Sequence, residues 1–227
     1  MQEIFKKVPL FSGLNNDEID AVIAITTIHN VRKNNIIVQE GDAGNAMFIL
    51  LCGSVKISYY APDGRELILS LLEEGSFFGE MSLLDKQPRS ATVTTLESVK
   101  IAQIRSRDFE RLLLKQPALS LKLLCEVVSR LRRTSLILER ISTMDVPHRL
   151  YSYLQDYCER FGKEKSASQC IVRLPTHQLI ADQLSTSRET ISRAMSSLKK
   201  ESIITTTSTR SVCIDTDAID TLLFAIQ

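Results

Sequence analysis

The chain has 227 residues, of which 44% are hydrophobic, and its formal net charge is +1. This length and composition predict one or two globular domains with a sizeable core. A strongly basic balance, which would indicate nucleic-acid binding by itself, is absent. There is no apolar stretch of about 18 residues and no secretory signal at the N-terminus, so we expect a cytoplasmic protein that does not span a membrane.

The five cysteines and three histidines stand singly along the sequence, with no CxxC pair and no other ligand spacing. This pattern predicts no metal, no iron–sulfur cluster and no disulfide framework, and it favours cysteines that are small buried hydrophobic residues. The GxSxG, Walker and HExxH motifs are also missing, so we predict that the protein is not an enzyme.

In the first half of the chain, the sequence pattern changes from helical to strand-like near residue 30. Residues 1–29 are predicted to be helical, with Asn16 and Asp17 capping an amphipathic run over 19–28. From about 31 to 105, short apolar runs alternate with turn signals, and Asp63-Gly64 between two such runs indicates a hairpin. Strands at this close and regular spacing predict a sandwich or barrel.

Residues 117–143 contain no glycine and, after Pro117, no further proline, and they show helical periodicity. Apolar residues recur at steps of three and four, with one polar interruption, at Leu121, Leu124, Val128, Leu131, Ser135 and Leu138. We call this row the seam. Its narrow, heptad-like form favours pairing with a second helix of the same kind, and packing on its own domain is the alternative.

The second half begins where Asp145 can cap a helix that has Pro147 in its first turn. We expect a helix over 146–161, a strand at 171–174, two short helices, a hairpin over 203–214 with its tip at 205–211, and a terminal helix after Asp217. Domain boundaries are therefore predicted at 1–116, 117–143 and 144–227.

Residues 78–92, which we call the cassette, place polar chemistry inside the apolar first domain. Gly79 lets the backbone approach a ligand closely, and Glu80 can start a short helix over 81–84. Arg89 offers a planar fork for a phosphate, and Ser90 adds a hydroxyl and a backbone N–H. These groups suit one phosphate and one sugar, although Glu80 and Arg89 alone are also compatible with a structural ion pair.

Residues 176–200 are predicted to form helix, turn and helix, with Thr176 capping the first helix and Ser187 the second. Arg188, Glu189 and Arg193 project from the first turns of the second helix, while Ile191, Ala194 and Leu198 face inward. Two arginines and an acid at a helix N-terminus suit base edges in a major groove, and an ordinary solvated helix surface is the alternative.

Both segments resemble the cAMP receptor protein (CRP/FNR) family of bacterial transcription regulators. The cassette FGEMSLLDKQPRSA is similar to the family pattern F-G-E-(M/L)-x-L…R-S/T-A, and SRETISR at 187–193 is similar to S-R-E-T-V-x-R. The resemblance spans nearly the whole chain. It implies an α+β protein with a jelly-roll-like β-roll that binds a cyclic nucleotide, a long dimerisation helix and a C-terminal winged helix-turn-helix.

For the ligand, the resemblance implies that Glu80 binds the ribose 2′-hydroxyl, and that Arg89 and Ser90 hold the cyclic phosphate beside the Gly79 backbone. Thr134 and Ser135 stand where the cAMP-binding branch has a Thr-Ser pair that meets the adenine, the serine reaching across from the second subunit. This pair explains the polar interruption of the seam and, with a serine after the arginine, favours cAMP over cGMP.

For DNA, the resemblance implies base reading by Arg188, Glu189 and Arg193 and backbone contacts by Thr176, Ser187 and Thr190. The implied target is a palindrome of TGTGA-type half-sites bound by a homodimer under allosteric control, with RNA polymerase as the partner of an activator. One departure is Ser185, at a turn position that is often glycine; a positive φ there costs about 1 kcal/mol.

Other readings of the sequence remain open. The protein can be a cGMP-responsive or ligand-independent regulator of the same family, or an oligomerisation module whose helix-turn-helix only packs. A nucleotide-hydrolysing enzyme that uses Glu80 and Arg89 is the alternative of another class.

Overall fold

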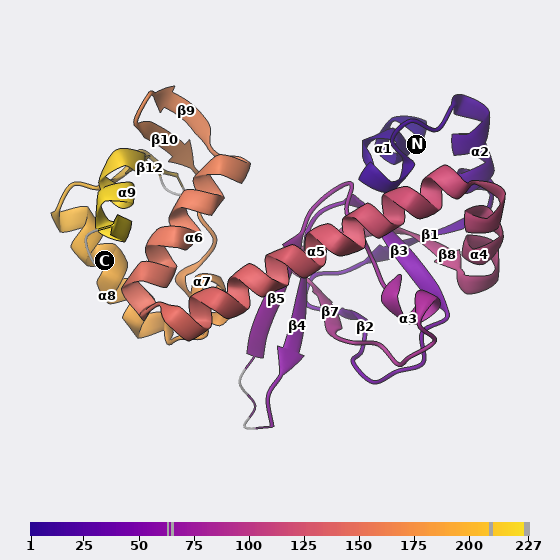
Figure 1. The fold of residues 1–227 in the computed structure, drawn as a ribbon, viewed down its shortest axis with the longest axis horizontal. Coiled ribbons are helices and arrows are strands. Elements are labelled where there is room, and N and C mark those ends of the chain that lie inside the picture. The colour runs from indigo at the N-terminus through magenta and orange to yellow at the C-terminus, as the bar shows by residue number, and fades with distance from the viewer. Residues whose placement is uncertain (63, 65, 209–210, 225–227) are drawn as a thin grey trace. The chain divides into compact units, whose positions relative to one another are not determined.

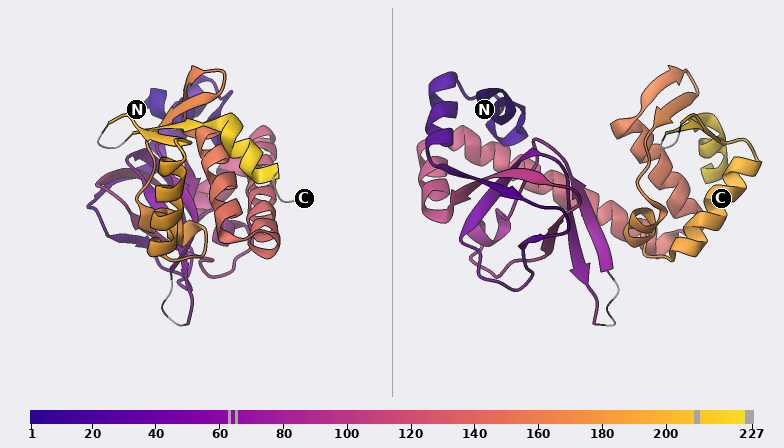
Figure 2. Two further views of the ribbon diagram at one scale, coloured as in Figure 1. Left: turned by 90° about the vertical axis from the view of Figure 1, so that its left-hand side faces the viewer. Right: turned by 180° about the vertical axis from the view of Figure 1, so that it is seen from behind.

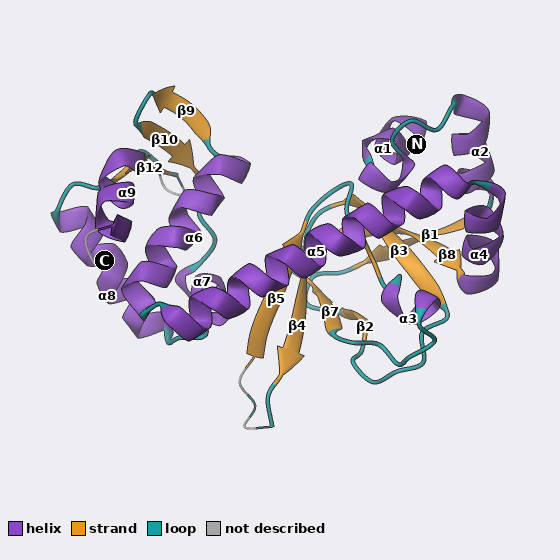
Figure 3. Cartoon of the chain, in the orientation of Figure 1, coloured by secondary structure: helices purple, strands orange, loops and turns teal. Residues whose placement is uncertain are grey.

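The computed structural model describes residues 1–62, 64, 66–208 and 211–224. The chain forms two compact units, Met1–Thr134 and Ser135–Gln227 (Figure 1). Both units combine helices with antiparallel strands (Figure 3), which confirms the predicted α+β class. In the described part of the chain, no helix is both long and apolar enough to cross a bilayer.

The N-terminal unit opens with α1 (Gln2–Lys7), the short 3₁₀ helix η1 (Pro9–Phe11) and α2 (Asn16–Ala24). Asn15 caps α2 by accepting a bond from the Glu18 N–H, and Glu18 accepts one from the Asn15 N–H in return. The prediction that this region stays helical to residue 29, with the cap at Asn16 and Asp17, was therefore wrong. Residues Thr26–Val31 form strand β1, because this β-branched segment pairs with β8.

Two four-stranded antiparallel sheets form the β-roll, with strand orders β1-β8-β3-β6 and β2-β7-β4-β5. The remaining strands of the roll are β2 (Ile36–Val38), β3 (Ala46–Cys52), β4 (Val55–Tyr60), β5 (Glu66–Leu72), β6 (Phe77–Phe78), β7 (Thr92–Thr95) and β8 (Val99–Arg105). Strand β3 is apolar and buried over Ala46–Leu51, so it lies in the centre of the core. The expected hairpin joins β4 and β5, and Gly64 has a positive φ; Asp63 lies outside the described residues.

Helices α3 (Met81–Leu84), α4 (Ser106–Lys115) and the long α5 (Pro117–Thr143) complete the roll. The first turns of α5 bury Leu119 and Leu123 in a cluster shared with α1, η1 and α2, whose indigo ribbons lie against α5 (Figures 1 and 2). The seam lies on another side of the helix. There Leu121, Leu124, Val128 and Leu131 are 40–64% exposed, so a large part of this apolar row faces solvent.

The C-terminal unit is built on α6 (Val146–Phe161), α7 (His177–Gln183), α8 (Arg188–Lys200) and α9 (Thr216–Phe224). Asp145 caps α6 by accepting a bond from the His148 N–H, and Pro147 lies in the first turn, as predicted. A small antiparallel sheet has the order β11-β12-β10-β9, with strands β9 (Lys163–Ser166), β10 (Gln169–Val172), β11 (Ile204–Thr206) and β12 (Val212–Asp215). The sequence did not predict β9. The tip of the β11–β12 hairpin includes residues 209–210, which lie outside the described residues.

The cysteines divide between the two units. Cys158, Cys170 and Cys213 are buried in the C-terminal unit, where the Cys170 Sγ lies 3.9 Å from the Cys158 carbonyl oxygen. Cys52 and Cys125 are exposed. The expectation of buried cysteines therefore holds for three of the five.

Candidate functional site

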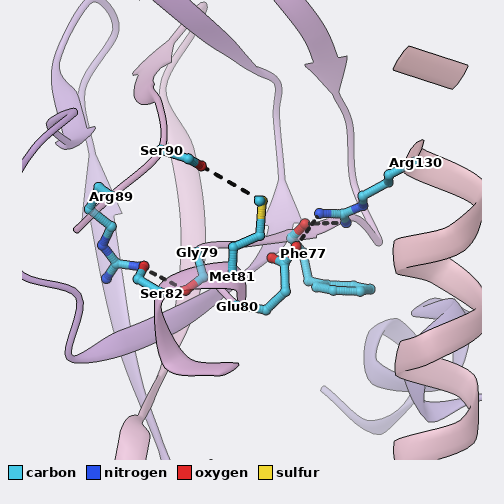
Figure 4. A network of polar contacts seen from close by, with 8 residues as sticks. All are labelled: Phe77, Gly79, Glu80, Met81, Ser82, Arg89, Ser90 and Arg130. Carbon is cyan, nitrogen blue, oxygen red and sulfur yellow. Dashed lines mark hydrogen bonds and ion pairs between the residues drawn. The ribbon is translucent and has the colours of Figure 1, made fainter. Parts of the chain in front are cut away.

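The cassette begins at Phe78, the last residue of β6, and continues through Gly79 and α3 to Arg89 and Ser90 (Figure 4). Gly79 has a φ of +81°, a region that favours glycine. A Cβ at this position would also lie 2.8 Å from the Arg89 Nη1 atom. Conformation and space therefore both require a glycine between the strand and the helix.

Glu80 stands at the start of α3, as predicted, with a backbone conformation that is already helical. The residue is only 1% exposed. One carboxylate oxygen, Oε1, accepts a bond of 2.7 Å from Arg130. The other, Oε2, is buried and has no hydrogen-bond partner among the described residues. A buried acceptor without a donor is unfavourable by about 1–3 kcal/mol, so this atom is suited to accept a hydrogen bond from a hydroxyl group of a ligand.

Arg89 is 6% exposed, and its guanidinium is fixed by neutral acceptors. Nη1 donates to the Gly79 carbonyl at 2.7 Å and to Ser82 Oγ at 3.0 Å, and Nη2 donates to the Ala46 carbonyl at 2.7 Å. A guanidinium has five N–H groups, so two remain after these three bonds. Burial lowers the pKa of Arg89, with Glu80 and Asp42 acting in the opposite direction, but the group stays charged.

Glu80 and Arg89 are not joined to each other as an ion pair. Glu80 pairs with Arg130, and Arg89 is held by two carbonyls and a hydroxyl. This geometry does not support the alternative that Glu80 and Arg89 merely neutralise each other. Instead, one short segment contains the buried Oε2 atom of Glu80, which has no hydrogen-bond donor among the described residues, and the buried cation Arg89.

Ser90 is exposed at the rim of the cassette. Among the described residues its hydroxyl has only a weak contact, 3.7 Å to the sulfur of Met81 (Figure 4). The loop before β3 closes over the other side, since the Arg89 N–H donates to the Asp42 carbonyl at 2.8 Å. In that loop, a Cβ on Gly44 would collide with Ser82 and come within 3.2 Å of the Arg89 Cζ atom. Gly44 and Ser82 therefore support Arg89, although the sequence analysis did not assign them to the site.

Arg130 is the principal residue that the sequence analysis missed. From α5 it donates to Glu80 and, at 2.7 Å, to the Phe77 carbonyl, and its guanidinium lies 4.4 Å from the centroid of the Phe77 ring. Arg130 thus ties α5 to both sides of Gly79. One turn further on, Thr134 is exposed and donates to the Arg130 carbonyl at 3.0 Å. Ser135 follows it in α5 as the first residue of the second unit.

In the C-terminal unit the helix-turn-helix forms as predicted, from α7 and α8. Thr176 caps α7 by accepting a bond from the Leu179 N–H, and Ser187 caps α8 by accepting one from Thr190 at 3.1 Å. Ser185 in the turn has a φ of 52°, the strained conformation considered from the sequence. The Thr186 N–H donates to the Ala181 carbonyl and closes the turn.

The first turns of α8 expose Arg188, Glu189 and Arg193, and none of these three has an ion-pair partner among the described residues. The opposite face buries Ile191 and Leu198, as expected. Ala194 is partly buried, and Met195, which the sequence analysis did not assign to the core, is almost fully buried. A rigidly packed helix therefore presents its charged side chains to solvent.

Comparison with known proteins gives a consistent result. Family models for the cyclic nucleotide-binding domain and the Crp-like helix-turn-helix domain match residues 28–116 and 148–220. A protein of Mycobacterium tuberculosis described as a CRP-like cAMP-activated global transcriptional regulator is 30% identical over 195 residues, which is 86% of this chain and 87% of the relative.

Two solved structures share the fold. A CooA mutant from Carboxydothermus hydrogenoformans superposes with a TM-score of 0.78 at 21% identity, over 89% of each chain. The regulator CLP of Xanthomonas campestris, described as responsive to c-di-GMP, has a TM-score of 0.75 at 21% identity, over 88% of this chain and 99% of that one.

Proposed function

This chain belongs to the CRP/FNR family of cyclic-nucleotide-binding transcription regulators, and from that membership we propose that it is a cAMP-dependent homodimer that recognises a TGTGA-type palindrome. In this proposal cAMP binds in the N-terminal unit and double-stranded DNA binds through the C-terminal unit. RNA polymerase is the expected further partner if the protein activates promoters.

The observation that carries the ligand assignment is the buried Oε2 atom of Glu80, which has no donor among the described residues. A ribose 2′-hydroxyl supplies such a donor. The two N–H groups left on Arg89, with the weakly engaged hydroxyl of Ser90, suit the single negative charge of a cyclic phosphate. Gly79 keeps the backbone close enough for a further contact.

The choice of cAMP rests on Ser90 after Arg89 and on Thr134 and Ser135, which we propose meet the adenine. We expect Ser135 to act from the second subunit. The family includes other ligands, since the M. tuberculosis relative is described as cAMP-activated and the X. campestris neighbour as c-di-GMP responsive. Binding measurements must therefore decide which nucleotide is the ligand.

The homodimer is proposed to form through the seam of α5. Exposed leucines and a valine recur there at helical spacing, a pattern typical of helix pairing. In a two-fold dimer the two α8 helices reach half-sites one DNA turn apart, roughly 34 Å. Ligand binding at Glu80 can affect α5 through Arg130, because this α5 residue donates a hydrogen bond to the Glu80 carboxylate. By preferring one dimer shape, the ligand shifts an existing equilibrium.

At the DNA, we propose that Arg188, Glu189 and Arg193 read base edges and that Thr176, Ser187 and Thr190 contact the backbone. The exposure of the three charged residues and the firm packing of α8 support base reading. Ser187 and Thr190 already share a bond of 2.8 Å between their hydroxyls, which orients both at the start of α8.

The test is binding of the full chain to a labelled TGTGA-palindrome duplex, at fixed salt, without ligand and with cAMP, cGMP or c-di-GMP. A duplex with scrambled half-sites is the control. We expect cAMP alone to tighten binding by about tenfold or more, or about 1.4 kcal/mol of coupling. Tight binding that ignores every nucleotide would contradict the switch. Failure to bind the duplex together with nucleotide turnover would instead favour an enzyme.

A further inference from the structure

Met81 begins α3, directly after Glu80, and its side chain extends from that helix toward Ser90 (Figure 4). The residue is 49% exposed. Its sulfur lies 3.7 Å from the Ser90 hydroxyl, which donates to it. A thioether is only a weak acceptor, so this contact leaves the Ser90 hydroxyl available to a ligand. An accessible thioether therefore lies beside one of the proposed phosphate donors.

The exposure of Met81 distinguishes it from most of the five methionines of the chain. Met47 and Met195 are buried, at 0% and 2% exposure, and Met144 is partly buried. Met1 is exposed as well, but it stands before α1 and outside the cassette. An oxidant in solvent therefore reaches the sulfur atoms of Met81 and Met1 before those of Met47 and Met195.

We propose that Met81 is a site of reversible oxidation and that its sulfoxide lowers the affinity of the cassette for its nucleotide. One oxygen atom of hydrogen peroxide is transferred to the sulfur of Met81. A sulfur lone pair forms the S–O bond, the O–O bond breaks, and the second oxygen leaves as water with both peroxide protons. The sulfur is oxidised by two electrons, and the peroxide is reduced by two. Enzymes of the methionine sulfoxide reductase class restore the thioether.

The expected loss of affinity follows from the contact with Ser90. Oxidation makes the side chain polar, and a sulfoxide oxygen accepts a much stronger hydrogen bond than a thioether sulfur does, so the Ser90 hydroxyl becomes engaged. The cyclic phosphate then loses one proposed donor. A net change of one hydrogen bond corresponds to about three- to tenfold in affinity. The inference rests on the proposed function, because it takes Ser90 to bind the ligand.

Three substitutions separate this site from the rest of the chain. Met81→Leu removes the sulfur and keeps an apolar side chain of similar volume. Met144→Leu is the matched control, because the sulfur of Met144 also lies near a serine hydroxyl, 3.9 Å from Ser152 Oγ, but outside the cassette. Ser90→Ala removes the hydroxyl through which the sulfoxide is proposed to act.

The experiment treats the full chain with hydrogen peroxide and then with dithiothreitol, which reduces sulfenic acids and disulfides at cysteine but leaves methionine sulfoxide in place. Peptide mass spectrometry measures the sulfoxide at each methionine. Calorimetry measures the affinity for cAMP, and thermal melts verify that each protein is folded.

We expect the oxidised wild type and the oxidised Met144→Leu variant to bind cAMP about three- to tenfold more weakly than before treatment. Incubation with a methionine sulfoxide reductase should restore the affinity. Met81→Leu should bind cAMP equally well before and after treatment. In Ser90→Ala, oxidation should change the affinity by less than about twofold, because the hydroxyl is already absent.

Sulfoxide at Met1 without sulfoxide at Met81 would overturn the inference. So would complete oxidation of Met81 with an unchanged affinity for cAMP, a loss that persists in Met81→Leu, or an undiminished loss in Ser90→Ala. Untreated protein that binds no cAMP would instead contradict the proposed function, and this result is obtained before any oxidant is added. The two failures are therefore distinguishable.

Discussion

The cassette and helix α8 both contain arginine, but they hold it in opposite ways. Arg89 is almost completely buried, and three hydrogen bonds to the surrounding chain fix its guanidinium. Arg188 and Arg193 are exposed and have no ion-pair partner among the described residues. The same side chain is thus part of the core in one unit and part of the surface in the other.

The difference reflects what each region is proposed to bind. A small ligand is surrounded, so its contacts must be positioned when the protein folds, and the roll provides a buried carboxylate and a buried cation. DNA is bound on an exposed surface of the protein. The side chains proposed to contact its bases are therefore exposed in the free protein and become ordered when the duplex binds. Mutations in the cassette should therefore affect folding and binding together, whereas mutations on α8 should affect binding alone.

The largest expected effect comes from a matched pair of substitutions, Arg89→Gln and Arg188→Gln. Arg89→Gln should weaken cAMP binding by at least about 2 kcal/mol, roughly 30-fold, and lower the free energy of unfolding, because the bound phosphate and three internal acceptors lose their donor. Arg188→Gln should leave both quantities unchanged. Calorimetry and chemical denaturation measure them. Equal effects of the two variants on stability would contradict the comparison.

Glu80→Gln tests whether the buried carboxylate of the cassette binds the ribose hydroxyl of the ligand. Loss of a charged acceptor should weaken cAMP binding by about 1.5–3 kcal/mol, roughly 10- to 150-fold. The same variant should bind 2′-deoxy-cAMP about as well as the wild type does, because that ligand has no hydroxyl for the Oε2 atom. Competition binding with both nucleotides gives the double-mutant cycle. An additive cycle would show that Glu80 does not meet the ribose.

Arg193→Ala examines the exposed side. Removal of one base contact should reduce duplex affinity by about 1–3 kcal/mol and relax the sequence preference at one base pair of each half-site. Because Arg193 is exposed, the unfolding midpoint should stay within experimental error of the wild type. Anisotropy with single-substituted duplexes measures the preference. A uniform loss across all duplexes would make Arg193 a phosphate contact instead.

The smallest effect is expected at the turn between α7 and α8. Ser185 has a positive φ, so Ser185→Gly should relieve strain and stabilise the C-terminal unit by up to about 1 kcal/mol, without altering duplex affinity. Thermal melts compare it with Ser208→Gly, an exposed position in the β11–β12 hairpin. A loss of stability in Ser185→Gly would contradict the strain argument.

Local signals allowed much of the fold to be predicted. The caps Asp145, Thr176 and Ser187, and the start of α3 at Glu80, are set by neighbouring residues, and the structure confirms all four. The helical prediction for 26–29 was wrong, because these residues pair with residues 101–104 of β8, more than seventy positions away. Strand β9 is polar and exposed throughout, so it carries no alternating pattern.

In the candidate site, too, residues close together in sequence were predicted, and a residue brought in by long-range packing was missed. Gly79, Glu80, Arg89 and Ser90 lie in one short segment, so their types and spacing were informative. Arg130 was visible only as a charged residue beside the seam, and its contacts with Glu80 and Phe77 arise from the packing of α5 on the roll. Sequence spacing contains no information about such a long-range approach.

The central claim, that nucleotide and DNA sites are coupled, is tested most directly through reciprocity. The dissociation constant of cAMP is measured by calorimetry with and without a saturating TGTGA duplex, at the salt used for DNA titrations. The account predicts that the duplex tightens the two cAMP-binding steps of the dimer, taken together, by the same factor by which saturating cAMP tightens duplex binding, about tenfold or more. An unchanged cAMP affinity would contradict it and leave two independent sites on one chain.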